Sequence, residues 1–159
     1  MELFVDDKPK IDNLDIKILT ILQKDSRKSF QEIARELVVS GGTIHVRMNR
    51  LKELGIVNGS RIILDYPKLG FDVTAFIGIN LHNAGGSLSV LEQLKKLDEI
   101  TEIHYTTGSY SLFIKVVLKS TLELKTFLVE KLQLIEEIQS TETLISLDQP
   151  VSRDIKLKM

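Results

Sequence analysis

The chain has 159 residues, of which 43% are hydrophobic and 27% charged, and its formal net charge is −1. This composition is that of a globular protein with one well-buried domain or two small ones, and it excludes a disordered or fibrous chain. The absence of cysteine excludes disulfides, thiolate metal sites and thiol catalysis, and the three histidines are scattered along the chain. We therefore expect neither a metal nor a cofactor.

The sequence carries no sign of a membrane location. Its first thirty residues lack the basic-then-apolar pattern of a signal peptide. No apolar stretch approaches the roughly 20 residues that a bilayer-spanning helix needs. We expect a soluble protein of the cytoplasm with no membrane partner.

Positive charge is concentrated in the first part of the chain. Residues 1–62 hold 11 Lys and Arg against 9 Asp and Glu, whereas residues 63–159 hold 10 against 13. Between residues 27 and 61, seven basic residues face only three acidic ones. A local basic excess of this kind is typical of a domain that contacts nucleic acid, although the whole chain is nearly neutral.

Three amphipathic helical patterns fill this first part, at residues 11–25, 29–39 and 40–55. The first pattern can be capped by Asp12 or Asn13, and the second opens with a capping box that starts at Ser29. The third, SGGTIHVRMNRLKELG, has Ser40 as N-cap and Gly55 where a C-terminal glycine belongs. The short connection between the second and third patterns is that of a helix-turn-helix.

A small β-wing is predicted after the third helix. The segment IVNGSRIILD, residues 56–65, has alternating apolar positions around Asn58-Gly59, a dipeptide that favours a hairpin turn. We therefore predict a winged helix-turn-helix DNA-binding domain over residues 1–64, with a linker to about residue 70.

The third helix offers hydrogen-bond donors for a major groove. With its apolar stripe against the core, the polar side chains left for DNA are Thr43, His45, Arg47, Asn49 and Arg50. Arg can pair with guanine and Asn with adenine, and flanking cations can contact phosphates. The alternative is a solvated helix face that merely carries charges.

The two glycines after Ser40 stand at the start of this helix. A helix start without side chains lets backbone N–H groups approach a phosphate, which the positive end of the helix also attracts. Ser40 and Gly42 are therefore added to the predicted DNA contacts. A loose turn between two helices is the alternative interpretation.

The second part of the chain, residues 71–159, changes to a mixed pattern. Strands are predicted at 71–82, 100–107, 109–120 and 140–147, and helices at 87–97 and 122–138. Ser87 and Thr121 are the expected helix caps, and the first of these helices is expected to bury Leu88, Leu91, Leu94 and Leu97. The order β-α-β-β-α-β predicts a ferredoxin-like sandwich, so the whole chain belongs to the α+β class.

Enzymatic chemistry finds little support in this part. It contains no glycine-rich phosphate loop, HExxH motif or nucleophile elbow, and His82 and His104 are more plausibly ordinary strand residues. The stretch TTGSYS, residues 106–111, is a polar interruption between two apolar strands. It is either a plain hairpin loop or a small-ligand site, in which hydroxyls and backbone amides hold a carboxylate.

Together these motifs resemble one family. The run VSGGTIHVRMNRLKELGIV, followed by TTGSYSLFIKV and IQSTETLISL, is similar to the leucine- and asparagine-responsive transcription regulators, the Lrp/AsnC family. Within it, GTIHVR and TG-x-YS are most similar to the asparagine-responsive branch. Ser109 and Ser111 stand where many members carry acidic residues, which argues against a leucine-type site.

The resemblance implies a mechanism and a set of partners. It implies a regulator that binds a double-stranded DNA operator through the third helix and forms dimers through its sheets, commonly assembling into an octamer. It implies an amino-acid effector, asparagine or a similar one, held where neighbouring dimers meet. The implied effector residues are Thr107, Gly108, Ser109, Tyr110, Ser111, Gln139, Thr141 and Thr143.

Two rival functions stay open from the sequence. One is an architectural DNA-binding module whose second domain only oligomerises and takes no effector. The other is an enzyme with a ferredoxin-like catalytic domain, for which no nucleophile or paired acid and base is visible.

Overall fold

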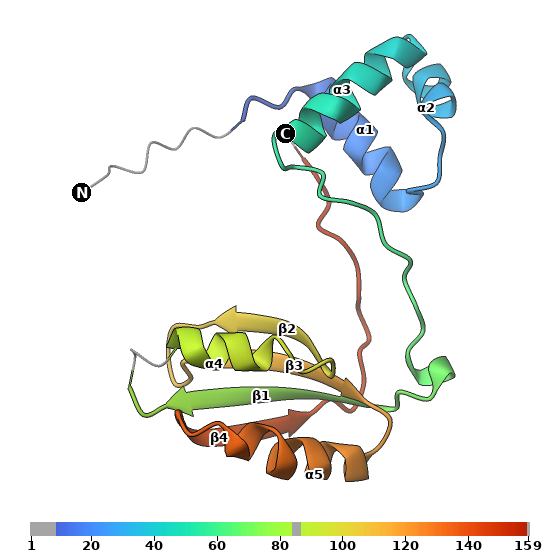
Figure 1. The fold of residues 1–159 in the computed structure, drawn as a ribbon. Coiled ribbons are helices and arrows are strands. Elements are labelled where there is room, and N and C mark those ends of the chain that lie inside the picture. The colour runs from blue at the N-terminus through green and yellow to red at the C-terminus, as the bar shows by residue number, and fades with distance from the viewer. Residues whose placement is uncertain (1–8, 84–86, 159) are drawn as a thin grey trace, which may run out of the picture. The chain divides into compact units, whose positions relative to one another are not determined.

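A computed structural model describes residues 9–83 and 87–158, which fall into two compact units. One unit holds the described residues up to Ile62 together with those from Val151 on, and the other is Ile63–Pro150. The residues after Val151 thus group with the helices rather than with the sheet, although they follow the sheet in the sequence. Figure 1 labels the elements of both units.

The first unit consists of three short helices, α1 (Asn13–Lys24), α2 (Phe30–Leu37) and α3 (Gly41–Glu53). Each begins at a predicted N-cap, since Asp12, Ser29 and Ser40 accept hydrogen bonds from backbone N–H groups of the first turns. Their apolar stripes meet in one core, which contains Ile18, Ile33, Ala34, Ile44, Met48 and Leu51. The predicted helix-turn-helix is therefore confirmed.

The end of α3 is defined by hydrogen bonds around a glycine. Gly55 has a φ of +68°, its N–H donates to Lys52 O, and the N–H of Ile56 donates to Leu51 O, each at 2.9 Å. This is the Schellman arrangement, which requires a left-handed residue directly after the helix. Gly55 thus terminates α3 as predicted.

The predicted β-wing is wrong. Residues 57–65 form neither strand nor hairpin, and the side chains of Ile62 and Ile63 are 83% and 89% exposed. A tight hairpin turn of the predicted type needs positive φ at both Asn58 and Gly59, whereas only Gly59 has it, at +153°. The segment is an extended connection, followed by the short 3₁₀ helix η1 (Pro67–Leu69).

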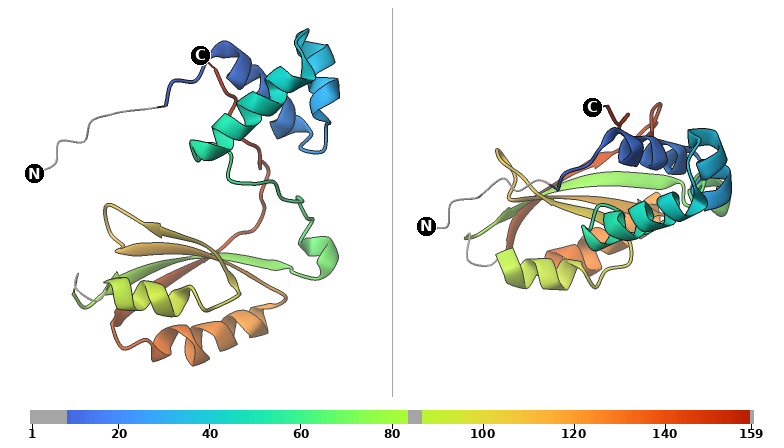
Figure 2. Two further views of the ribbon diagram at one scale, coloured as in Figure 1. Left: turned by 45° about the horizontal axis from the view of Figure 1, so that its top comes forward. Right: turned by 90° about the horizontal axis from the view of Figure 1, so that it is seen from above.

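The second unit is a four-stranded antiparallel sheet. Its strands are β1 (Val73–Leu81), β2 (Ile100–Tyr105), β3 (Leu112–Leu118) and β4 (Ile138–Ile145), in the order β2-β3-β1-β4. The helices α4 (Ser87–Leu94) and α5 (Thr121–Glu130) both cover the same face of the sheet, as Figure 2 shows. This is the predicted ferredoxin-like sandwich, and the α+β class is confirmed.

The core of this unit lies between the sheet and the two helices. Alternate residues of the central strands β1 and β3 are fully buried, including Ile77, Ile79 and Ile114, and Phe127 of α5 packs among them. Because side chains alternate across a strand, the residues between them lie on the opposite face of the sheet, which neither α4 nor α5 covers.

Some details of the helices differ from the prediction. Ser120, not Thr121, caps α5, because the Ser120 side chain accepts from the N–H of Glu123. The helix ends at Glu130, and the short 3₁₀ helix η3 (Leu132–Leu134) takes the place of its predicted last turns. In α4 the buried residues are Val90 and Leu94, whereas Leu88 is 72% exposed. The helical stripe is therefore rotated relative to the one inferred from the leucines.

Replacing Gly55 by alanine tests the end of α3. We expect Gly55→Ala to lower the free energy of unfolding by about 1–2 kcal/mol, because an L side chain is strained at positive φ. Gly41→Ala is the matched control, since Gly41 has negative φ in the first turn of the same helix and its added Cβ would meet nothing within 4 Å. Urea unfolding followed by circular dichroism measures both, and equal stabilities would contradict this account.

Candidate DNA interface and effector site

The outer side of α3 carries most of the side chains predicted to contact DNA. Gly42, His45, Asn49 and Arg50 are exposed, and so is Val46, at 68%. Apart from Arg50, which is bound to α1, these positions recur every three or four residues, so they form one stripe opposite the buried Ile44, Met48 and Leu51. We call Gly42, His45, Val46 and Asn49 the outer stripe.

The start of α3 is organised by two hydroxyls. The Oγ atoms of Ser40 and Thr43 share a hydrogen bond of 2.8 Å, and the N–H of Thr43 donates to Ser40 Oγ at 3.1 Å. An added Cβ at Gly42 would find only Ser40 Oγ, at 3.8 Å. The first turn is thus capped by its own residues and leaves Gly42 open to solvent.

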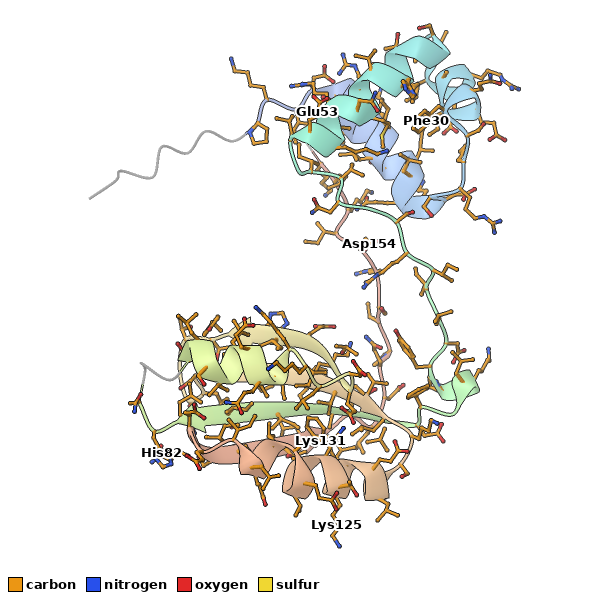
Figure 3. The ribbon with its side chains drawn as sticks, in the orientation of Figure 1. Phe30, Glu53, His82, Lys125, Lys131 and Asp154 are labelled. Atoms are coloured by element: carbon orange, nitrogen blue, oxygen red, sulfur yellow. The ribbon has the colours of Figure 1, made fainter. Side chains whose placement is uncertain are left out.

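The His45 ring lies against α2. Its centroid is 5.8 Å from that of Phe30, with the two rings at 64°, an edge-to-face contact. In Figure 3, Phe30 marks the start of α2 and Glu53 the end of α3. His45 is therefore held in place on one side while it stays exposed on the other.

The two arginines predicted to contact DNA are bound to acidic residues of α1. Arg47 Nη1 donates to Asp15 Oδ1 at 3.0 Å and also to Asp12, and Arg50 Nη1 donates to Asp15 Oδ2 at 3.3 Å. Arg50 Nη2 also donates to the backbone oxygen of Lys10. The hydrogen bonds that Arg47 donates to Asp12 and Asp15 raise the pKa of Arg47, and the one to Asp12 lowers the pKa of Asp12.

Asp15 is the residue of this site that the sequence analysis missed. Its side chain is fully buried, and it is the only buried charged residue in the described part of the chain. A signal was available, because Asp12 and Asp15 have the spacing of a capping box, and both of its hydrogen bonds form. Both aspartates lie outside residues 27–61, so the basic excess of that window overstates the free charge around α3.

The predicted effector loop joins β2 to β3 and bends at Gly108, whose φ is +111°. Thr107, Gly108, Ser109 and Ser111 are exposed. The loop is tied down by Thr106 Oγ1, which donates to Tyr110 O at 2.7 Å, and by the N–H of Ser111, which donates to Ile79 O at 2.9 Å. Its hydroxyls and backbone groups are therefore presented from a fixed frame.

Tyr110 reaches from this loop across the sheet. Its ring lies over Gly78 of β1, where an added Cβ would be 2.6 Å from the ring atoms. Its hydroxyl donates to the Glu142 carboxylate of β4, and this hydrogen bond raises the pKa of Tyr110. Gly78 and Glu142 were missed by the sequence analysis, because only the strand register brings them opposite each other.

The predicted effector residues of β4 are not gathered around Tyr110. Thr141 and Thr143 pair with Ile79 and Ile77, so they lie on the face that the helices cover, and both are half-buried. Gln139 is exposed beside the irregularity at the start of β4. Within one chain, the β4 residue that contacts this loop is Glu142, through the Tyr110 hydroxyl, and not Gln139, Thr141 or Thr143.

The uncovered face of the sheet is partly aromatic. Phe76 and Phe113 stack with ring centroids 6.0 Å apart, and Tyr110 lies 6.0 Å from Phe113. Beside them, Lys115 Nζ donates to Glu102 at 3.1 Å, and His104 lies 3.3 Å from the same carboxylate. An apolar centre with charged neighbours is the composition of a surface that another protein surface covers.

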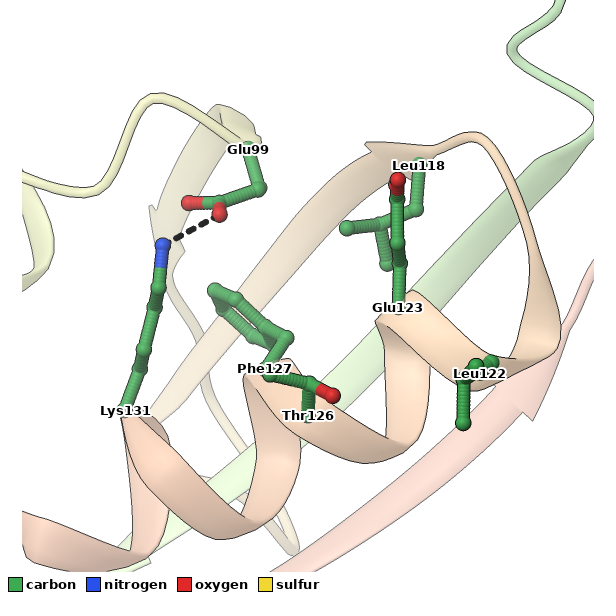
Figure 4. Close-up of a pocket in the computed structure, with 7 residues that line it drawn as sticks. All are labelled: Glu99, Leu118, Leu122, Glu123, Thr126, Phe127 and Lys131. Atoms are coloured by element: carbon green, nitrogen blue, oxygen red, sulfur yellow. Dashed lines mark hydrogen bonds and ion pairs between the residues drawn. The ribbon is translucent and has the colours of Figure 1, made fainter.

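A separate hollow of about 250 Å³ lies beside α5, as Figure 4 shows. It is lined by Glu99, Leu118, Leu122, Glu123, Thr126, Phe127 and Lys131. Burial is the largest single influence and raises the pKa of Glu99, but the hydrogen bond from Lys131, a backbone hydrogen bond and the charge of Lys131 together outweigh it, so this pKa lies below its usual value. Lys131 thus pairs with Oε1 of Glu99, whereas Oε2 is buried without a hydrogen-bond partner in the described part of the chain. No predicted effector residue lines this hollow.

The described residues contain neither a metal-binding cluster nor a membrane-spanning helix. No group of three or more His, Cys, Asp or Glu side chains there could hold a metal ion. None of the described helices is long and apolar enough to cross a bilayer.

A helix-turn-helix unit whose third helix exposes a polar stripe places this chain in the class of DNA-binding proteins. Residues 11–52 match the AsnC-type helix-turn-helix domain, and residues 74–155 match the Lrp/AsnC ligand binding domain. The chain is 50% identical over 146 residues to the regulatory protein AsnC of Haemophilus influenzae, which covers 92% of this chain and 97% of that protein. The chain therefore belongs to the Lrp/AsnC family of transcription regulators, whose members are named as regulatory proteins and not as enzymes.

Solved structures agree with this assignment. The structure of AsnC from Escherichia coli superposes with a TM-score of 0.89 at 49% identity, covering 93% of this chain and 99% of that one. The regulator NMB0573 of Neisseria meningitidis, solved as a complex with L-Met, gives a TM-score of 0.86 at 19% identity, covering 91% and 94%. At that identity the second comparison shows the shared fold alone.

The Tyr110–Glu142 contact can be tested by titration. We expect the pKa of Tyr110 to lie above the ordinary tyrosine value of about 10, because ionising its hydroxyl beside a carboxylate is unfavourable. Glu142→Gln should lower it toward that value. Ultraviolet absorbance between pH 9 and 12 measures the titration, and Tyr110→Phe identifies which part of the signal belongs to this ring.

Glu102→Gln is the control for this titration, because it removes a carboxylate from the same face of the sheet without touching Tyr110. It should leave the pKa of Tyr110 unchanged. An equal effect of the Glu102 and Glu142 variants would show that Tyr110 responds to overall charge and not to its hydrogen bond.

Proposed function

We propose that this regulator binds a specific operator through α3 and that a small amino acid, asparagine in the first place, modulates its binding. The observation that carries the proposal is the outer stripe, a set of exposed side chains on a helix whose other faces are fixed by the core and by α1. The polar loop at Gly108 lies in the other unit, so DNA and effector are bound by different parts of the chain. Such an activity belongs in the cytoplasm, where the DNA is accessible.

Base contacts are assigned to the outer stripe. Asn49 can form a bidentate pair with adenine, and the exposed Val46 methyl groups can contact thymine methyls. His45 lies beside them, and its ring nitrogens can donate or accept a hydrogen bond. Ser40, Gly42 and Thr43, at the positive end of α3, are assigned to a phosphate.

Arg47 and Arg50 are assigned to phosphates as well as to the aspartates. Both hydrogen bonds of Arg47 to the described chain are donated by Nη1, so Nε and Nη2 are left as donors for a phosphate. Arg50 is 43% exposed while it is bound to Asp15. A guanidinium has five donors, which is enough for a carboxylate on one side and a phosphate on the other.

Dimers and larger assemblies are proposed on the uncovered face of the sheet. Stacking this face of Phe76, Phe113 and Tyr110 on that of a second copy would bury the aromatic side chains. Further association of dimers to an octamer would bring loops of neighbouring dimers together. The effector is proposed to lie at that junction, with Thr107 to Ser111 from one chain and Gln139, Thr141 and Thr143 contributed across the interface.

Several observations support an amino acid as effector. The loop offers Ser109 and Ser111 hydroxyls and the backbone of Gly108, which suit a carboxylate and an amide side chain and carry no charge of their own. A protein of the same fold, NMB0573, is solved with L-Met, so the fold accommodates an amino acid. The alternative is a DNA-binding architectural protein without an effector.

The DNA assignment predicts the effect of Asn49→Ala. On a duplex that the wild-type chain selects from a randomised pool, affinity should fall about 5- to 150-fold, because a bidentate base contact is worth about 1–3 kcal/mol. The slope of log affinity against log salt should not change, since Asn49 neutralises no phosphate. Gel-shift titrations at several salt concentrations measure both quantities.

Gln133→Ala is the control for this prediction, because Gln133 is an exposed amide of the sheet unit. It should bind the selected duplex like the wild-type chain. If Asn49→Ala also binds like the wild type, the base contact is refuted. Equal wild-type affinity for every duplex would instead favour the architectural alternative.

The proposed effector site predicts that mixing the protein with asparagine releases or absorbs heat as the amino acid binds. Calorimetry with a panel of amino acids should show saturable binding of asparagine, and Ser109→Asp should abolish it, because a carboxylate would repel the carboxylate of the ligand. Solution mass with and without asparagine would report whether assembly changes at the same time. Absence of heat from every amino acid would refute the effector.

Thr126→Asp is the control, because Thr126 is an exposed hydroxyl at the hollow beside α5, which no proposed effector residue lines. It adds the same charge to the same unit. If it abolished binding as Ser109→Asp does, the effector would have to be placed elsewhere.

A further inference from the structure

We propose that Asp15 is a positioning residue for DNA recognition, which sets the rotation of α3 by holding Arg47 and Arg50 from the neighbouring helix. This inference rests on the proposed use of the outer stripe for base contacts. Asp15 itself is fully buried and would not touch DNA.

Both oxygens of the Asp15 carboxylate accept hydrogen bonds. Oδ1 accepts from Arg47 at 3.0 Å, and Oδ2 accepts from Arg50 at 3.3 Å and from the N–H of Asp12 at 3.1 Å. The first two bonds come from α3 and the third comes from Asp12, the N-cap of α1. One carboxylate therefore joins the start of α1 to the middle of α3.

Because the Asp15 charge is buried, it restricts where α3 can lie relative to α1. A buried carboxylate without partners is far more unfavourable than an exposed one, so α3 must keep both arginines within reach of Asp15. Asp12 contacts the same Arg47, but its side chain is 53% exposed, so water and salt can replace that contact. The constraint on α3 thus comes from Asp15.

The two arginines fix the helix because of their spacing. Arg47 and Arg50 are three residues apart and lie on the side of α3 that faces α1, while Val46 and Asn49 precede each of them by one residue, about 100° around the helix. A rotation that moved the outer stripe would pull the arginines from Asp15. By holding the arginines on the side of α3 that faces α1, the Asp15 carboxylate therefore also fixes the direction of the outer stripe, which is proposed to contact bases.

The same carboxylate limits non-specific binding. Arginines on an exposed helix attract any DNA through its phosphates, independently of sequence. Asp15 neutralises part of that charge and restricts both side chains to one place. Without it, the arginines would still bind phosphates, but the outer stripe would lose its fixed orientation, so specific and non-specific affinity should change differently.

Asp15→Asn in the full chain tests the inference. Affinity for the duplex selected by the wild-type chain should fall about tenfold, while affinity for a scrambled duplex of equal length stays within about twofold or rises. The ratio of the two affinities is the readout, because a merely destabilised protein would lose both affinities equally. A fall of both together, or no change of either in the folded variant, would overturn the inference.

Glu36→Gln is the matched control, because Glu36 on α2 forms an exposed ion pair with Lys28. It changes the net charge by the same amount, and its affinity ratio should equal that of the wild type. An equal drop in the ratio would show that charge alone is responsible, which also overturns the inference.

Arg50→Lys decides the question even if Asp15→Asn does not fold. Lysine keeps the charge and a phosphate contact but cannot bridge Asp15 and Lys10 O at once. The affinity ratio should fall several-fold, and an unchanged ratio would overturn the inference. If the wild-type chain itself selects no duplex, the proposed function fails, and this inference fails with it.

Discussion

The buried carboxylate of Asp15 is the interaction on which the DNA-binding unit depends. The core of this unit is small, built from short helices with only a few fully buried side chains. Apolar contacts hold the helices together but are tolerant of small rotations, whereas a buried charge bound by two arginines is not. The ion pairs therefore supply an orientation that packing alone leaves loosely defined.

In the ligand-binding unit, the polar loop at Gly108 is held in position without a buried charge. Its loop at Gly108 is anchored at both ends by backbone hydrogen bonds, and Tyr110 extends from it across β1 to Glu142. Only a glycine at position 78 leaves room for that ring. A glycine in the middle of a strand is thus explained by a neighbour on the next element. In both units, one polar contact between distant residues positions the groups proposed to bind a ligand.

Much of this architecture could be predicted from the sequence, because it depends on patterns of residues that are close together in the chain. Capping side chains at Asp12, Ser29 and Ser40, the glycine after α3 and the change from helical to alternating apolar spacing are all short-range patterns. The β-wing failed because a favourable dipeptide does not form a hairpin unless both turn residues adopt the required backbone. The predicted cap of α5, Thr121, was wrong by one residue, because the adjacent Ser120 also has a hydroxyl that can cap a helix.

The contacts within the sites could not be predicted in the same way. Asp15 meets Arg47 and Arg50 across more than thirty residues, and Glu142 meets Tyr110 only through the register of β1 with β4. The charge count between residues 27 and 61 suggested free arginines because their acidic partners lie outside that window. The family resemblance directed attention to α3 and to the loop at Gly108, but the ion pairs and the ring over Gly78 required the structure.

A crystal structure of the full chain bound to its selected duplex would test the account most directly. The account predicts that Val46 and Asn49 face base edges in the major groove, while Arg47 and Arg50 contact phosphates and still hold Asp15. A complex in which either arginine has left Asp15 to pair with a base, or in which the outer stripe of α3 faces away from the groove, would contradict it.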